Sequence, residues 1–260
     1  MAIQTLRIIK ASSRELFIAA VTFLGIALCL YVDSFHDLGL QKAVGQCGWV
    51  VLAGLLLRES NLVRLQVLVA ILFATAGEHF ASGMMQGYIY YFHNIPAYIP
   101  PGHGMVYLTA VALARSPLFR SYQRQITWLV LISMGLWSLW GVTLAGRSDW
   151  LGMILFLIYV PCVLWGRNPL VYLAAFFITT HLELIGTALN TWAWAPIDPT
   201  FSLSQGNPPS GVATWYCLVD AVAIGGAAFI IRQGQRLKNL GRKLKGPLTA
   251  PEWIRAAAED

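Results

Sequence analysis

The sequence predicts an all-α, polytopic membrane protein with about eight transmembrane helices arranged as two parallel four-helix repeats. The first observation is composition: 57% of the 260 residues are hydrophobic, only 12% are charged, and the mean hydropathy is +0.60. Soluble globular proteins carry about 25% charged residues. The second is a series of apolar stretches, and the third is a pair of aromatic, Pro-rich loops that each follow an acid. Water-soluble enzyme folds are therefore excluded.

The apolar stretches approach the roughly 20 residues that a spanning helix needs. The first follows basic residues, but no small-residue cleavage site comes after it, so we expect a retained helix rather than a signal peptide. The second and fourth are short, which leaves seven spans as an alternative. The stretches are 15–33, 42–57, 63–85, 101–116, 126–146, 149–166, 168–189 and 211–232.

The basic residues predict the orientation, because loops that face the cytoplasm are enriched in Lys and Arg. With eight spans, Lys42 and Arg147 fall on one side and nearly all other basic residues on the other. We therefore expect an integral protein of a bacterial cytoplasmic membrane, with both termini in the cytoplasm. The net charge of +6 is then a topology signal rather than a nucleic-acid signal. Loops 86–100 and 190–210 would face outward.

An internal repeat divides the chain into a first repeat at 1–116, a second at 117–232 and a basic cytoplasmic tail at 233–260. The halves share an acid, an aromatic pair and a diproline in the same order. Four spans in each half would relate the halves by an axis along the membrane normal. The alternative is chance similarity, since Trp and Tyr gather at membrane interfaces anyway.

Three acids lie inside apolar runs with no Lys or Arg near them: Glu78, Glu183 and Asp220. Ionisable residues in hydrocarbon are costly, so each marks a candidate functional site. Burial raises the pKa of a carboxyl group, and a neutral acid in a dry aromatic pocket is a candidate Brønsted acid. We add His103, beside the first diproline, to the catalytic candidates. The alternative for each acid is a structural hydrogen bond between helices.

The substrate-binding candidates are aromatic and polar side chains in or beside the two loops. Aromatic rings could line an apolar pocket or stabilise a cation, although an interfacial belt explains each ring equally well. No HxxxH or HExxH motif groups the histidines, and the four cysteines show no CxxC spacing, so we predict no metal site and no cofactor. The candidates are His79, Tyr88, Tyr90, His93, His181, Asn190, Trp192, Trp194, Asn207 and Ser210.

The order of these motifs resembles the carotenoid hydratases of the bisanhydrobacterioruberin hydratase type, over residues 77–107 and 183–220. Those polytopic enzymes add water across a terminal isoprenoid double bond. The string Pro100–Gly104, with its His103, departs from that pattern. A mid-membrane Glu with a late Asp also resembles the transmembrane meroterpenoid cyclases. The residues that carry the resemblance are Glu78, Tyr88, Tyr90, Trp192, Trp194 and Pro208.

We therefore expect a membrane lyase- or isomerase-type enzyme that acts on an isoprenoid or other lipid by acid–base chemistry. Glu78 would donate the proton, and Glu183 or Asp220 would position water or accept a proton. The partners would be this substrate and membrane lipids, without nucleic acid. Two alternatives are a proton-coupled transporter or lipid-binding protein, and a structural subunit of a membrane complex.

Overall fold

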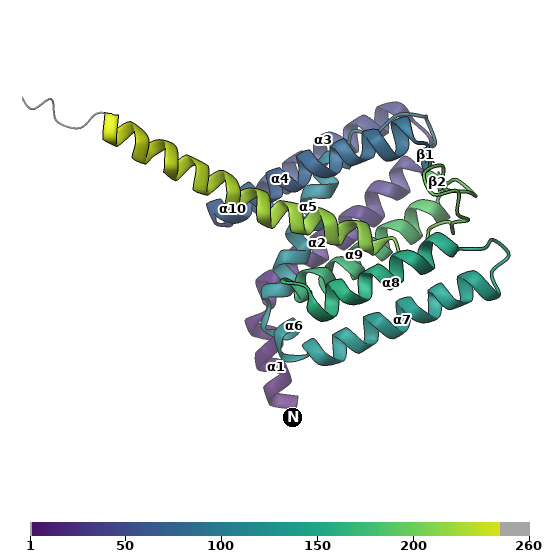
Figure 1. Cartoon of the computed structure of the whole chain (residues 1–260), viewed down its shortest axis with the longest axis horizontal. Coiled ribbons are helices and arrows are strands. Elements are labelled where there is room, and N and C mark those ends of the chain that lie inside the picture. Colours follow the sequence, from purple (N-terminus) through teal and green to yellow (C-terminus); the bar gives the residue numbers. More distant parts are fainter. Residues whose placement is uncertain (1, 245–260) are drawn as a thin grey trace, which may run out of the picture.

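The computed structural model describes residues 2–244, with side chains over 7–240. This part of the chain is mainly helical, with a single two-stranded sheet. The elements are α1 (Ala2–Ala11), α2 (Ser13–Asp33), α3 (Leu38–Leu56), α4 (Asn61–Glu78), the π-helix η1 (His79–Met84), β1 (Tyr88–Tyr90), α5 (Ile99–Arg115), α6 (Pro117–Ser121), α7 (Gln123–Thr143), α8 (Trp150–Trp165), α9 (Pro169–Ala188), β2 (Trp192–Trp194) and α10 (Ala213–Leu244) (Figure 1).

Five helices are long and apolar enough to cross a membrane: α2, α4 with η1, α7, α9 and α10. The predicted helical membrane protein is thus confirmed at this level. Each of the eight predicted stretches also contains a helix, but α3, α5 and α8 are not both long enough and apolar enough to cross a membrane. For α5 the physical reason is its burial inside the protein. Every residue from His103 to Ala110 is buried, so protein surrounds this helix and its sequence need not be as apolar as a lipid-facing one.

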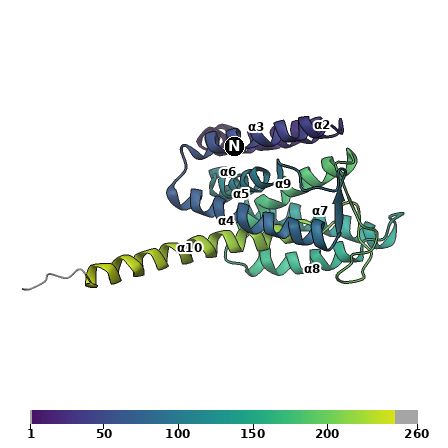
Figure 2. The ribbon, with the colours of Figure 1, turned by 90° about the horizontal axis from the view of Figure 1, so that it is seen from above.

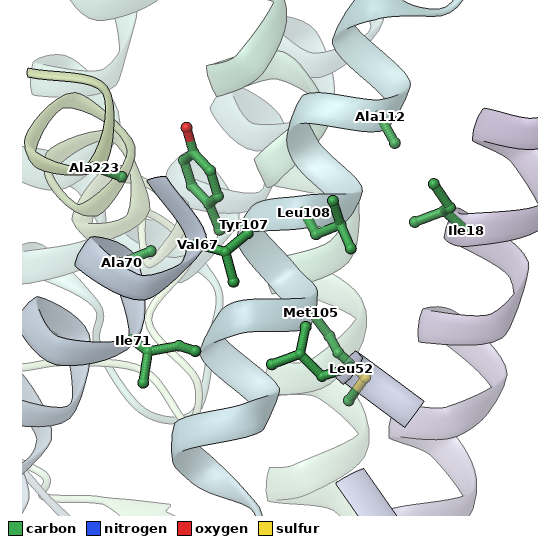
Figure 3. Close-up of a cluster of buried hydrophobic side chains, with 10 residues drawn as sticks. All are labelled: Ile18, Leu52, Val67, Ala70, Ile71, Met105, Tyr107, Leu108, Ala112 and Ala223. Atoms are coloured by element: carbon green, nitrogen blue, oxygen red, sulfur yellow. The ribbon is translucent and has the colours of Figure 1, made fainter. Parts of the chain in front are cut away.

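Four helices form a ring at the centre of the molecule. Helix α4 packs against α5 and α10, and α9 packs against the same two helices. One apolar cluster within the ring joins α5 to α4 and includes Tyr107, Leu108, Val67 and Ile71 (Figure 3). Helices α2 and α3 lie on one side of the ring and α8 on the other (Figure 2).

The two long loops meet at one end of the ring, which we call the loop end. Strand β1 pairs antiparallel with β2 in the register Tyr88–Trp194, Ile89–Ala193 and Tyr90–Trp192. The guanidinium of Arg147 donates to the carbonyl oxygens of Trp194, Ala195 and Gln205. The strand pairing therefore joins the two loops, and Arg147 holds the second loop to the turn between α7 and α8.

The opposite end of the ring carries a buried ionic network. The carboxylate of Glu59, in the turn between α3 and α4, accepts hydrogen bonds from Arg115 at 2.6 and 2.7 Å and from Arg14 at 2.9 Å. Burial acts to raise the pKa of Glu59, but the hydrogen bond and charge of Arg115 outweigh it and hold the pKa below its usual value. Arg14 and Arg115 therefore join α2, the α3–α4 turn and α5.

The last helix extends beyond the rest of the fold. Helix α10 continues without a break to Leu244, and its second half projects away from the ring (Figure 1). The first part of the predicted basic tail, 233–244, is thus helical. Its remainder, 245–260, lies outside the described residues.

A close approach of α3 to the first loop gives a test of the packing. A Cβ atom on Gly45 would lie 2.7 Å from Cβ and 2.8 Å from the carbonyl carbon of Ala97, whereas one on Gly54 would meet nothing within 4 Å. We expect Gly45→Ala to destabilise the protein by about 1–3 kcal/mol. Gly54→Ala, on the same helix, should leave stability unchanged or raise it by up to ~1 kcal/mol. Thermal unfolding in detergent measures both, and equal midpoints would contradict the packing.

The ionic network predicts a pH dependence of stability. Because the folded-state pKa of Glu59 is lowered, its contribution is complete above the unfolded value of about 4.3 and is lost as pH falls further. Glu59→Gln should unfold at a temperature lower by at least a few °C at pH 7. That gap should close as the pH falls below about 4.3. Arg58→Gln, whose side chain lies outside the network, is the charge control, and a gap independent of pH would argue against the assignment.

Candidate active site

A mainly apolar cavity of about 540 Å³ lies inside the loop end of the molecule. Its walls come from α2, α3 and the four ring helices, and strands β1 and β2 and residues within 198–201 of the second loop line it at the loop end. A volume of this size is typical of small-molecule sites. The few polar groups along its walls include Glu78, His103, Glu183 and Tyr216.

Glu78 is the last residue of α4, where the chain passes into the π-helix η1. π-Helical turns are rare and often lie at functional sites. The Oε2 atom of Glu78 accepts hydrogen bonds from the hydroxyls of Tyr88 at 2.6 Å and Tyr90 at 2.8 Å. Its Oε1 atom lies 3.1 Å from Nε2 of His103. The side chain is only 11% exposed, so protein groups replace most of its water.

The two tyrosines are neutral hydrogen-bond donors. Burial and the negative charge of Glu78 raise the pKa of both Tyr88 and Tyr90 far above the ordinary value. Each phenol therefore keeps its proton and directs it at the carboxyl group of Glu78.

Glu183 has an equivalent arrangement on α9. Its Oε2 atom accepts hydrogen bonds from the indole nitrogens of Trp192 and Trp194, both at 3.0 Å. Gly186, one turn further along α9, leaves room for the ring of Trp192, because any Cβ atom there would collide with it.

The sheet explains why both acids find two aromatic donors. Residues i and i+2 of a strand point to the same face, so both tyrosines of β1 and both tryptophans of β2 turn toward the cavity. The ring centroids of Tyr88 and Trp194 are 4.6 Å apart, and those of Tyr90 and Trp192 are 5.9 Å apart. The four rings thus form one aromatic layer that links the two acids.

Three predicted residues support the loop end from outside the cavity lining. Asn207 Oδ1 accepts a hydrogen bond from the backbone N–H of Trp194. Ser210 shares a hydrogen bond of 2.9 Å with Ser138. His181 lies with Nε2 3.0 Å from the carbonyl oxygen of Phe23, which ties α9 to α2.

The other four predicted residues lie elsewhere. His79, His93 and Asn190 are exposed and are not among the cavity-lining residues. Asp220 is buried in α10 but does not line the cavity either. His79 lies outside the cavity because it directly follows Glu78 and so points about 100° away from it around the helix.

Several supporting residues escaped the sequence analysis. Asp149 accepts hydrogen bonds from the backbone N–H groups of Gly206 and Ser210, both at 2.7 Å. Gln205 donates to the carbonyl oxygen of Gly87 and so joins the two loops. Arg147 was the one clue in the sequence to these contacts. It is one of two basic residues on its side of the membrane in the predicted topology, but we interpreted it only as a sign of orientation.

Within residues 2–244, no three His, Cys, Asp or Glu side chains are grouped so that they could hold a metal ion. No protein-family model, curated protein or solved structure matches the chain.

The double hydrogen bond to Glu183 can be tested by substitution. Glu183→Leu leaves two buried indole N–H groups without an acceptor, at a cost of about 1–3 kcal/mol for each. Glu183→Gln keeps one acceptor oxygen and should lose less. Thermal unfolding in detergent should therefore rank wild type above Gln and Gln above Leu. A Leu variant as stable as wild type would show that the indoles do not depend on this acid.

Proposed function

We propose that this chain is an integral membrane enzyme that protonates a carbon–carbon double bond of an isoprenoid or other lipid, leading to hydration or cyclisation. The observation that carries the proposal is the environment of Glu78. Its carboxyl group faces a large apolar cavity and is held by two phenols and one imidazole. Electrostatic interactions are strong in such a low-dielectric site.

In this mechanism Glu78 donates the reacting proton, which its Oε1 shares with Nε2 of His103 at a distance of 3.1 Å. The proton is transferred to one carbon of the double bond, where the π electron pair forms the new C–H bond and leaves a carbocation on the other carbon. The hydroxyls of Tyr88 and Tyr90 stabilise the carboxylate charge through Oε2, since hydrogen bonds to a charged acceptor are stronger than neutral ones.

The aromatic layer stabilises the carbocation, because ring faces attract cations. In hydration, a water oxygen then bonds to the cationic carbon and releases one proton to Glu183 or back to Glu78. In cyclisation, a second double bond attacks instead and the final cation loses a proton to the same acceptor. Neither route consumes a proton overall or needs an oxidant or reductant. The acid is regenerated directly when Glu78 accepts the proton, and by a later proton transfer when Glu183 accepts it.

The proposal includes eight spans in two repeats, α2–α5 and α7–α10, with both termini in the cytoplasm. Two observations support the repeat. Helix α5 packs on α9 as α10 packs on α4, and each acid accepts two aromatic donors from the strand that follows it. The Glu59 network, rich in arginine, would lie at the cytoplasmic end.

The shape of the cavity favours an enzyme over a transporter. Its lining on the ring helices stops near Phe73 on α4, Val106 on α5 and Val219 on α10. Beyond it lie the buried side chains of the cluster in Figure 3 and, further along, the Glu59 network. A transporter needs a route between the two faces, and this packing counts against one.

The test is product analysis with Glu78→Gln in membranes supplied with linear isoprenoids. General acid catalysis contributes about 10²–10⁴-fold, so we expect turnover to fall by at least about 100-fold. Tyr90→Phe removes one hydrogen bond and should cost about tenfold or less. Glu15→Gln, at the opposite end of the ring, is the matched control. Undiminished turnover in Glu78→Gln would remove this residue from the mechanism.

A further inference from the structure

One helical turn beyond the cavity, each of the four ring helices carries a second polar side chain. Nine buried side-chain atoms within the described residues have no hydrogen-bond partner, and four of these atoms lie at this level. They are Oγ1 of Thr75 on α4, Oη of Tyr107 on α5, Oγ1 of Thr180 on α9 and Oδ2 of Asp220 on α10. We call these four residues the second polar layer.

Helical spacing places this layer directly beside the cavity residues. Thr75 and Thr180 each precede a cavity acid by three residues, while Tyr107 and Asp220 follow His103 and Tyr216 by four. Residues three or four apart share a helix face. Because α4 and α9 run toward the loop end and α5 and α10 run away from it, all four steps lead about 5 Å in the same direction.

The packing of the ring brings the helices of the layer together. Tyr107 belongs to the same buried cluster as Ala223, which lies one turn beyond Asp220 on α10. In Figure 3 the ring of Tyr107 stands between α5 and the helices that carry Ala70 and Ala223. Tyr107 and Asp220 are each only 1% exposed.

The surroundings of Asp220 contain no compensating charge. The titratable side chains close enough to feel a charge on Asp220 are uncharged phenols and a thiol: Tyr107 of α5, Tyr159 of α8, Tyr172 of α9, and Tyr216 and Cys217 on its own helix. Across the part of the chain that the structure describes, none of the ion pairs involves Asp220. A lone buried carboxylate is very costly, so the neutral acid is the form that fits this site.

Buried polar atoms without protein partners are usually satisfied by ordered water, which needs two to four such partners. The second polar layer offers four. We infer that it binds buried water and stores a proton on Asp220. Tyr216, one turn from Asp220 and with its ring centroid 6.1 Å from that of His103, connects this store to the Glu78–His103 pair.

The role of the store in turnover rests on the proposed function. Each hydration transfers one proton to carbon and releases one proton from the attacking water, so no proton is consumed overall. The layer carries the released proton back to the pair. Along this route each water or hydroxyl accepts one proton as it releases another.

Infrared spectroscopy of the purified full chain tests proton storage without any substrate. We expect a carboxylic C=O band that shifts in D₂O and is absent from Asp220→Asn, but remains in Glu78→Gln. Tyr107→Phe removes only a hydroxyl and should shift the frequency of the band. This variant keeps the test decisive if Asp220→Asn does not fold. Identical spectra for wild type and Asp220→Asn would overturn the inference. Loss of the band on adding sodium chloride would overturn it too, because the site would then bind a cation.

Turnover tests the return route separately. Tyr216→Phe should keep the Asp220 band and lower turnover at least about tenfold, equal to about 1.4 kcal/mol of barrier. The loss should be greatest at high pH, where external protons are scarce. Unchanged turnover would refute the return route. If wild type turns over no isoprenoid, the proposed function fails, whereas the infrared result still decides whether the second polar layer stores a proton.

Discussion

Three residue pairs between β1 and β2 determine the geometry of the candidate site. Strand residues alternate between two faces, so this short pairing points two tyrosines and two tryptophans into one cavity. Each pair meets the acid that precedes it in the sequence. A slip of one strand by one residue would turn both rings of that strand away from its acid. Two contacts support this register. Arg147, between α7 and α8, donates to the carbonyl oxygens of Trp194 and Gln205 in the second loop, and the side chain of Gln205 donates to the carbonyl oxygen of Gly87 in the first.

The ring of α4, α5, α9 and α10 gives this sheet a fixed base. The two ends of this ring carry different kinds of side chain. At the loop end, aromatic side chains surround an apolar cavity with few polar groups. At the other end, Glu59 is paired with Arg14 and Arg115, so the polar groups there satisfy one another. Free polar oxygens remain between these ends, in the second polar layer.

Hydropathy and charge predicted the helices well, because burial in lipid demands long apolar runs with internally satisfied backbones. The same analysis identified Glu78, Glu183 and His103, and the structure brings these three residues to one cavity. It could not sort the remaining polar residues. His79 and Asn190 lie within the same sequence windows as the site yet face outward, since side-chain direction depends on packing. The catalytic roles and the two-repeat arrangement stay predictions.

The sequence by itself determined the helical membrane class, the positions of the apolar helices and the order of acid, aromatic pair and diproline in each half, because these depend on local composition and spacing. Only the tertiary structure decided that each acid accepts hydrogen bonds from its own aromatic pair. It also separated Asp220 from the cavity lining and left its Oδ2 without a hydrogen-bond partner, as it did for polar oxygens of Tyr107, Thr75 and Thr180. Those relations join residues far apart in the chain, and only the packing of the ring and the register of two strands fix such distances.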